Sequence, residues 1–385
     1  AAARAGKKVL LLEKSVSLGG LATIGLINLF VPMCNGRGVQ IIKGMAEEFL
    51  RLSIKDGYDT IPDEWKNGEP GEGAKTRYLT KYSPSIFSLE LTELLDKEGV
   101  DLFYDTVVSE PVMDGGHCRG LIVENKSGRE YYEGKIIVDT TGDADVLYRA
   151  GVPPRRGGNY YTMISNATNL DLMKKAVESG DIADAYTGVT GGRSNLYGGG
   201  HPEGMPLFEG VNVNSVTDFI IKNHLDTLAE VRKGDRKRDD IVMLPGMAQF
   251  RTTRCLIGDK EFDMNDAYRH CDDSIGAICD FDRKDYLFEV LVKTGYDNLI
   301  TAGRTASAKP DYSWDILRVI PPAIITGQAA GIAAALSIDD GVPIYDVDIH
   351  ALQSELEAQD VMLHFDDSLI PEKEADDVHM DIGHM

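Results

Sequence analysis

An acid and two glycines near the start of the chain are the first residues whose types and spacing suit ligand binding. Residues 9–12 form a continuous apolar run, of the kind that a strand buried on both faces requires, and Glu13 follows it directly. In a dinucleotide-binding βαβ unit, the acid that ends the second strand accepts hydrogen bonds from ribose hydroxyls. Gly19 and Gly20 have no side chains, so a ligand could lie against the backbone there. We therefore expect a nucleotide site; a buried parallel strand that ends in a surface glutamate is the simpler alternative.

Three arginines, one histidine and one cysteine are the groups that could bind a substrate or move protons and electrons. Arg251 and Arg254 are three residues apart, so they would share a face on a helix and point apart on a strand. Arg318 precedes a segment rich in alanine and glycine. His201 lies in a glycine-rich stretch, and Cys34 follows the Gly-Gly turn. An ordinary surface or structural side chain is the simpler alternative at each position, and the sequence favours it for His201 and Cys34.

The cysteines of the chain are too dispersed to form a recognisable redox or metal centre. They are five in number, and no C-x-x-C pair occurs among them: Cys34, Cys118, Cys255, Cys271 and Cys279. We expect neither a redox-active disulfide nor an iron–sulfur cluster, and no metal-ligand spacing stands out. Reduced thiols of a cytosolic protein are the default expectation.

Charge and hydropathy limit the partners of the chain. The 385 residues carry a formal net charge of −22, which would repel nucleic acids and anionic membranes. An anionic small-molecule substrate remains possible where arginines bind it locally. We recognise no signal peptide and expect no apolar run long enough to cross a bilayer. We therefore expect a cytoplasmic protein without nucleic-acid or membrane partners; the sequence gives no indication of the oligomeric state.

Hydrophobic periodicity and turn residues predict alternating helices and strands. Ser83 and Gly99 are typical of the start and end of a helix between them. Residues 56–76 are rich in Asp, Pro and Gly and predict a loop or flap. The expected helices are 42–53, 84–98, 170–179, 218–233 and 321–336. The expected strands are 100–110, 118–125, 131–138, a return to the parallel sheet at 136–140, and 299–302.

Two stretches far apart in the chain resemble one known family. DNLITAGR at 297–304, with RV at 318–319 and GQAAG at 327–331, is similar to the C-terminal signature of FAD-dependent oxidoreductases with a glutathione-reductase-like FAD domain. VDTTGD at 138–143 resembles the strand and turn that return to this domain. The resemblance is to bacterial members and is distant to fumarate reductase flavoproteins and to the flavin-containing subunit of heterodisulfide reductase. The lack of clustered cysteines departs from heterodisulfide reductase, whose flavin-containing subunit carries iron–sulfur clusters.

The resemblance implies an α/β fold with a Rossmann-like FAD domain, a β-meander and an inserted α+β substrate domain. The implied parts are the first half of the FAD domain at 1–149, with a flap at 54–82, the substrate domain at 150–290, the second half of the FAD domain at 291–340, and a C-terminal helix with an acidic tail at 341–385. In the family the first strand and the turn G-x-G-x-x-G come before the position of Ala1, so we expect about 15–20 further residues there. The segment after Glu289, at 290–292, looks shortened relative to the family.

The resemblance also implies FAD as the cofactor and assigns roles to residues at the matching positions. The implied cofactor-binding residues are Glu13, Lys14, Gly19, Gly20, Thr141, Gly142, Asp143, Gly303, Arg304 and Ile324. A helix that begins near residues 321–324 would direct its dipole at the flavin. Asp143 could equally belong to a plain turn that caps the strand, and Gln328 and Gly331 suit helix packing better than cofactor contact.

We therefore expect a flavoenzyme that transfers hydride between flavin N5 and a small organic substrate. Arg318 is the expected catalytic residue, by position relative to the arginine that delivers a proton in fumarate-reductase-like relatives, and His201 is a weaker candidate. One alternative is an electron-transfer component of a larger redox complex, which would require a partner protein. The other is a protein that keeps the fold without binding FAD.

Overall fold

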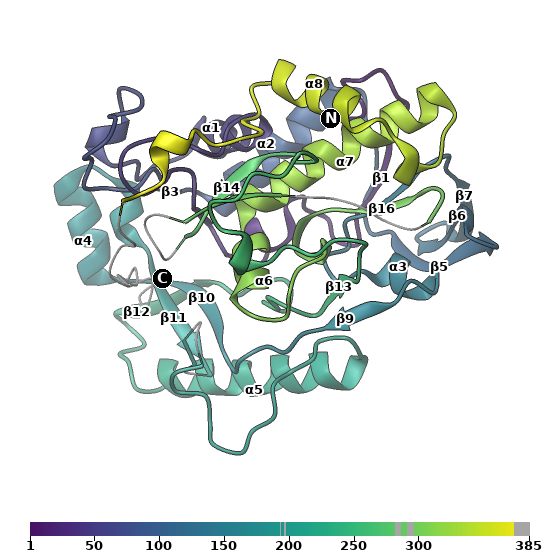
Figure 1. Ribbon diagram of the computed structural model, residues 1–385. Helices are drawn as coiled ribbons and strands as arrows, with labels where there is room; N and C mark the ends of the chain where they lie inside the picture. Colours follow the sequence, from purple (N-terminus) through teal and green to yellow (C-terminus); the bar gives the residue numbers. More distant parts are fainter. Residues whose placement is uncertain (193, 196–197, 282–285, 291–295, 373–385) are drawn as a thin grey trace.

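Two pairs of short parallel strands belong to the first and last parts of the chain. The computed structural model describes residues 1–192, 194–195, 198–281, 286–290 and 296–372 (Figure 1). β1 (Leu10–Leu12) pairs with β4 (Asp101–Phe103), and β8 (Ile137–Asp139) pairs with β16 (Leu299–Thr301). Within these described ranges, no ladder joins the two pairs. Leu10 is 36% exposed, so the prediction of a strand buried on both faces is wrong for β1, which has a ladder partner along one edge.

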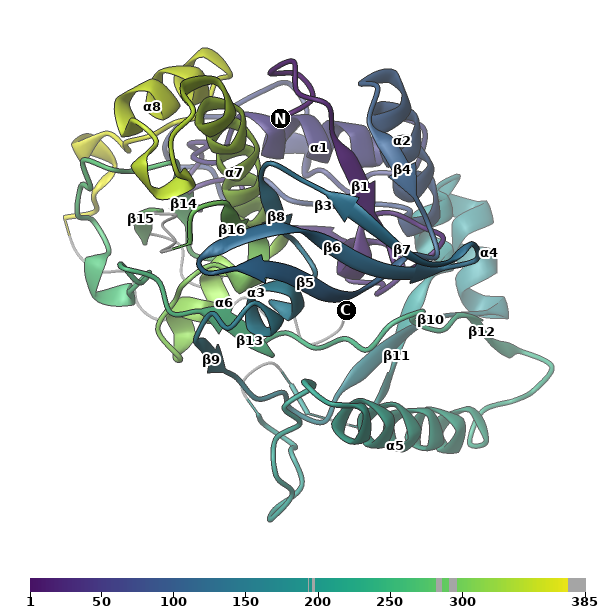
Figure 2. The same cartoon turned by 90° about the vertical axis from the view of Figure 1, so that its right-hand side faces the viewer.

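Four helices cover the strand pairs and share the largest core. They lie together in Figures 1 and 2 and are α1 (Met45–Ile54), α2 (Pro84–Lys97), α7 (Ile320–Asp340) and α8 (Ile349–Ala358). The alanines of α7 are small enough for close packing of its neighbours, and Ala329 and Ala330 are fully buried. The start of α2 is confirmed, because Ser83 Oγ accepts a hydrogen bond from the N–H of Ile86 and Pro84 follows at the first helical position.

The expected flap over residues 56–76 is partly packed against this core. It contains a short 3₁₀ helix (Asp63–Trp65), and β3 (Thr80–Lys81), which follows it, pairs antiparallel with β2 (Leu29–Phe30). Trp65 is buried and stacks on Tyr78 at a centroid distance of 4.9 Å. The aromatic pair anchors the segment, although its loops are exposed.

An antiparallel meander crosses one side of the molecule, as predicted. Its strands are β5 (Val107–Asp114), β6 (His117–Asn125) and β7 (Gly128–Glu133), and Figure 2 shows them facing the viewer. The strand predicted over 100–110 is two strands, β4 and β5, because the chain turns at Asp105, where φ is +50°. The stretch predicted over 131–138 likewise divides into β7 and β8. A second core lies beneath the meander and includes Leu121, Val123, Leu147 and Leu299.

The middle of the chain forms a smaller lobe with its own core. β10 (Met163–Asn169) lies between β11 (Thr187–Gly191) and β12 (Asp239–Met243), with α4 (Leu170–Ser179) and α5 (Val213–Val231) beside them. The side chains of this core are Tyr161, Met163, Phe208, Phe219 and Phe250. α4 has the predicted bounds, whereas α5 begins earlier than predicted because the side chain of Asn212 caps it.

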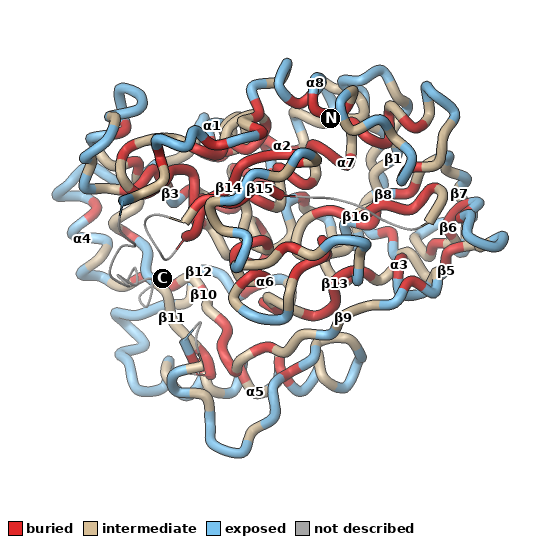
Figure 3. The backbone as a smooth tube through the Cα atoms, in the orientation of Figure 1, coloured by how far each residue is buried: buried red, intermediate tan, exposed pale blue. Residues whose placement is uncertain are grey.

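Residues after 250 pack in the large core, although the substrate domain was expected to extend to residue 290. β9 (Pro154–Arg156) pairs with β13 (Arg254–Leu256), and β14 (Ala277–Cys279) pairs with β15 (Leu287–Glu289). Side chains of β13 to β15 and of the segment after α8 pack in the same cluster as α7, and Figure 3 shows these buried stretches. By packing, the smaller lobe therefore ends near residue 250. The expected shortening at 290–292 and the acidic tail lie mostly outside the described residues.

α7 corrects the expectation that no segment is long and apolar enough to cross a bilayer. Its 21 residues pass that test by length and composition, although 67% of its most apolar window is buried inside the protein. The alanines and isoleucines that make α7 apolar are also the side chains that it buries in the core.

Candidate active site

The turn after β8 is held by an acid that the sequence reasoning did not single out. Asp139 is buried, and its Oδ1 accepts hydrogen bonds from the N–H and the hydroxyl of Thr141 at 3.0 and 2.7 Å. Its Oδ2 accepts the N–H of Leu147 at 2.9 Å, at the start of α3 (Asp145–Arg149). Burial raises the pKa of Asp139, while these hydrogen bonds oppose the increase. The sequence signal for Asp139 was an acid at the end of a predicted strand, directly before Thr-Thr-Gly.

Asp143 bridges this turn to the C-terminal half of the chain. Asp143 Oδ1 accepts from Arg304 Nη2 at 3.0 Å and from Thr253 Oγ1 at 2.8 Å. Gly142 has φ of +79°, and a Cβ atom there would lie 2.6 Å from the Arg304 guanidinium. The turn therefore needs glycine for both conformation and space. Of the predicted residues, the structure brings together Thr141, Gly142, Asp143 and Arg304.

Gly303 and the start of α7 lie beside this group. The N–H of Gly303 donates to Thr326 Oγ1 at 2.8 Å, which fixes the loop against α7. α7 begins at Ile320, its N-cap Val319 makes no side-chain cap, and two prolines follow. The positive end of the helix dipole is thus left without a side-chain acceptor. Ile324 lies in the next turn and is partly buried.

Glu13 follows β1 at the edge of the other strand pair. Its Oε1 accepts from the N–H of Ser15 at 2.7 Å, which leaves Oε2 for a ligand. Lys14 is exposed. Gly19 has φ of +99° and packs against Thr23, so its role is local, whereas the space around Gly20 is open and suits close approach of a ligand.

These groups fit the needs of FAD. A ribose needs a hydrogen-bond acceptor, which Glu13 Oε2 offers. A pyrophosphate needs positive charge and donors, and Arg304 Nε is a buried donor with no partner in the described part of the chain. The N-terminus of α7 offers positive potential to a reduced isoalloxazine. The residues present therefore suit a bound flavin dinucleotide.

Arg251 and Arg318 come from separate segments and interact electrostatically, whereas Arg254 does not join them. Arg318 follows α6 (Tyr312–Leu317) and forms an ion pair with Asp315 at 2.8 Å. Desolvation and, after it, the charge of Arg318 lower the pKa of Arg251 to about 10, and the charge of Asp315 opposes this decrease. Arg254 lies on β13, pairs with Asp145 at 2.8 Å, and has its guanidinium 4.3 Å from the ring centroid of Tyr148. Arg254 is therefore a structural residue.

His201 and Cys34 have structural contacts. His201 Nδ1 accepts the N–H of Tyr161 at 3.1 Å, and Nε2 lies 3.0 Å from the carbonyl oxygen of Met205, to which it donates. Both ring nitrogens thus hold the loop, and these contacts do not support an acid–base role for His201. Cys34 is fully buried, and its Sγ accepts the N–H of Tyr78 at 3.1 Å. The positions of Gln328 and Gly331 agree with the packing alternative, since Gln328 Oε1 accepts the N–H of Met45 at 3.0 Å.

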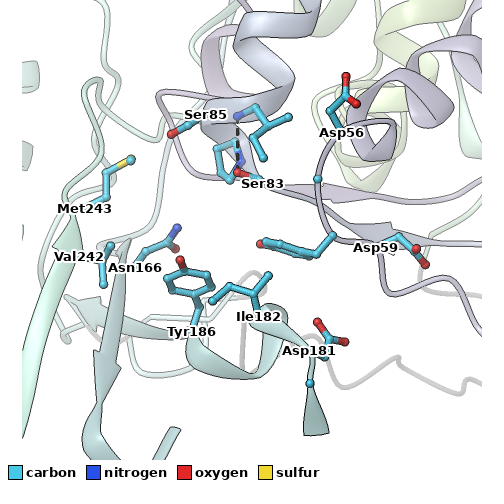
Figure 4. A pocket seen from close by; sticks show the side chains of 15 residues that line it. Asp56, Asp59, Ser83, Ser85, Asn166, Asp181, Ile182, Tyr186, Val242 and Met243 are labelled. Carbon is cyan, nitrogen blue, oxygen red and sulfur yellow. Dashed lines mark hydrogen bonds between the residues drawn. The ribbon is translucent and has the colours of Figure 1, made fainter. Parts of the chain in front are cut away.

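A pocket of about 760 Å³ lies between the loop at 56–59, the start of α2, and the smaller lobe (Figure 4). Tyr58 and Tyr186 stack there at 6.4 Å, and burial raises the pKa of Tyr58 to about 12. The described residues that line the pocket include three acids, Asp56, Asp59 and Asp181, and no lysine or arginine. It suits an uncharged or cationic group and does not suit an anion.

Comparison with known proteins identifies the class. The model of the family "FAD dependent oxidoreductase" matches residues 1–185 and 287–356, which include every predicted cofactor-binding residue and Arg318. The chain belongs to this family, and its cofactor is FAD. Arg251 and His201 lie outside the matched ranges. No curated protein sequence matches the chain.

Solved structures of flavoenzymes resemble the chain distantly. CabE, an aromatic hydroxylase from angucycline biosynthesis, is 12% identical with a TM-score of 0.45, over 96% of this chain and 67% of its own. The p-nitrophenol 4-monooxygenase PnpA from Pseudomonas putida is 13% identical with a TM-score of 0.44, over 93% and 83%. A geranylgeranyl bacteriochlorophyll reductase-like protein from Thermoplasma acidophilum is 14% identical with a TM-score of 0.42, over 94% and 79%. These likenesses carry no argument about the substrate.

Proposed function

We propose that the protein is an oxidoreductase that transfers hydride between flavin N5 and a small organic anion. FAD, when bound, supplies a two-electron donor or acceptor at N5. Arg251 would hold the carboxylate of the substrate, and Arg318 would hold or move the proton. Glu13, Gly20, Gly303 and Arg304 would hold the cofactor.

The observation that carries this proposal is that two partly buried arginines, Arg251 and Arg318, share a single acid, Asp315. Arg251 and Arg318 bring two positive charges together, and Asp315 offsets one of them. Arg251 makes no ion pair within 4.0 Å among the described residues. With a pKa of about 10, Arg251 is cationic at neutral pH, so a carboxylate would complete the charge balance. A positive site of this kind is unexpected in a protein of net charge −22 unless it serves an anion.

A comparison of two probes of the same size tests the proposal. The FAD-loaded protein would be titrated with crotonate and with crotonamide, and binding would be followed by the flavin absorbance. We expect crotonate to bind at least tenfold more tightly, because a desolvated ion pair is worth more than about 1.4 kcal/mol. Equal binding of the acid and the amide would overturn the assignment of an anion site.

Two arginine variants locate the site, one as the test and one as its control. Arg251→Met should remove the preference for crotonate while leaving FAD bound. Arg156→Met is the matched control, since the Arg156 side chain is 54% exposed on β9. A preference that survives in Arg251→Met, or one that is lost in Arg156→Met, would contradict the role of Arg251.

A further inference from the structure

Three metal-binding side chains from distant segments converge beside the β14–β15 hairpin. His270 lies in the loop before β14, Glu289 ends β15, and His364 follows α8. The Nδ1 atoms of His270 and His364 lie 2.8 and 3.0 Å from the same oxygen, Glu289 Oε1. All three potential ligand atoms lie within 4.8 Å of one another.

The hydrogen bonds of His270 require an extra positive charge. Its Nδ1 faces Glu289 Oε1 at 2.8 Å, and its Nε2 faces Asp367 Oδ1 at 2.7 Å. A neutral imidazole carries one N–H, so it cannot donate to both carboxylates. A second proton or a cation must therefore occupy one of these two contacts. A cation would leave the N–H on Nε2 to donate to Asp367, which is the usual outer-shell support of a metal-bound histidine.

The carboxylate at the centre of the cluster is buried without a lysine or arginine. The Glu289 side chain is fully buried, and in the described part of the chain its ion-pair partners within 4.0 Å are the two histidines alone. Its Oε2 accepts the N–H of Cys271 at 2.5 Å, which fixes the direction of Oε1. A buried carboxylate is costly unless it is paired or binds a metal ion.

The histidine rings are positioned in advance and open to solvent on one side. The side chains of His270 and His364 are 41% and 44% exposed, so an ion can reach the cluster. His270 stacks on the buried ring of Phe365 at 4.7 Å. Two nitrogen ligands and one oxygen ligand would leave a coordination position for water.

We infer that His270, Glu289 and His364 bind a divalent transition metal ion, with Zn²⁺ as the leading candidate. Two imidazoles and one carboxylate suit zinc, cobalt, nickel or copper better than magnesium or calcium, which prefer all-oxygen sites. Donor atoms about 2.0–2.2 Å from a tetrahedral ion lie roughly 3.3–3.5 Å apart, so the N–O separations of 2.8 and 3.0 Å would widen by about half an ångström as the ion enters. The ion would join the segment after α8 to the β14–β15 hairpin. The dispersed spacing of these residues is the reason that no metal motif appears in the sequence.

Metal binding to the full-length protein tests this inference directly. Protein freed of metal with a chelator would be titrated with Zn²⁺, and separately with Mg²⁺, and followed by equilibrium dialysis and by the melting temperature. We expect one tight Zn²⁺ ion per chain, a higher melting temperature with Zn²⁺, and no such change with Mg²⁺. Absence of stoichiometric Zn²⁺ binding would overturn the site in favour of a protonated His270.

Histidine variants separate this site from the other histidines. His270→Ala and His364→Ala should each weaken Zn²⁺ binding at least tenfold. Two controls should bind Zn²⁺ as the native protein does: His117→Ala, which removes an exposed histidine of β6, and the double variant His379→Ala/His384→Ala, whose positions lie outside the described residues. Wild-type affinity in both His270→Ala and His364→Ala, or loss of binding in either control, would refute the assignment. Because both histidines are partly exposed, their removal should leave the protein folded.

Discussion

Removing the Asp143 carboxylate tests whether the Asp143–Arg304 ion pair joins the two halves of the FAD region. Asp143→Ala deletes the acceptor of Arg304 Nη2 at 3.0 Å and of the Thr253 hydroxyl at 2.8 Å. Arg304 would then be a nearly buried cation without its acid, and its Nε is already without a partner in the described part of the chain. The variant should therefore be substantially less stable than the native protein.

The burial of the pair sets the size of the effect. Breaking a fully buried ion pair costs about 3–5 kcal/mol. The side chains of Arg304 and Asp143 are 12% and 19% exposed, so water can recover part of this loss. We expect Asp143→Ala to lower the free energy of unfolding by about 2–4 kcal/mol. Thr253→Val removes one hydrogen bond and leaves the ion pair, so it should cost about 1 kcal/mol.

Urea unfolding without FAD measures these differences, with tryptophan fluorescence as the signal. Trp314 is a local reporter, because its Nε1 donates to the carbonyl oxygen of Arg304 at 2.8 Å. The double variant Asp143→Ala/Arg304→Met should cost less than the sum of the two single variants, since the two residues interact directly. A loss below about 0.5 kcal/mol in Asp143→Ala, or strict additivity in the double variant, would refute the reasoning. A parallel FAD titration should show weaker binding in Arg304→Met and not in Thr253→Val.

Three further predictions concern the cofactor and the packing of the N-terminal segment. Glu13→Ala should weaken FAD binding by about 1–3 kcal/mol in a fluorescence titration, through loss of hydrogen bonds to a charged acceptor; unchanged affinity would remove Glu13 from the ribose site. Arg4→Ala should cost less than about 1 kcal/mol at pH 7, since its pair with Glu48 at 2.7 Å is exposed. Arg4 lowers the pKa of Glu48, so the stabilisation from this pair is complete above the ordinary glutamate pKa and is lost as pH falls through the lowered pKa. A difference in urea stability between the variant and the native protein that grows on acidification would contradict this. Gln328→Leu should destabilise the protein by about 1–3 kcal/mol, because it leaves the buried N–H of Met45 unpaired. The FAD affinity of the folded fraction should not change.

Local patterns in the sequence determined much of the secondary structure and the class of the protein. Ser83, Pro84 and Gly99 define α2 through capping, which depends on residues within one turn of the helix end. α4 was also predicted at its observed bounds, and the structure shows Asn169 and Gly180 capping its two ends. The family signatures at 138–143 and 297–304 lie on β8 and β16 and in the turns that follow them. Such features can be read locally because their hydrogen bonds and burial pattern repeat over a few residues.

The partners of the chemically important side chains were decided by the tertiary structure alone. Asp143 and Arg304 are 161 residues apart, and no sequence pattern says that the acid meets this arginine. The sequence left open whether Arg251 and Arg254 would share a face or point apart; in the structure Arg254, on β13, pairs with Asp145, while Arg251 lies in the field of Arg318. The cluster of Glu289 with two histidines depends on how the segment after α8 returns to β15. Contacts of this kind arise when a shared core brings distant segments together, because apolar burial is non-directional and carries no local signal for the polar groups that it places side by side.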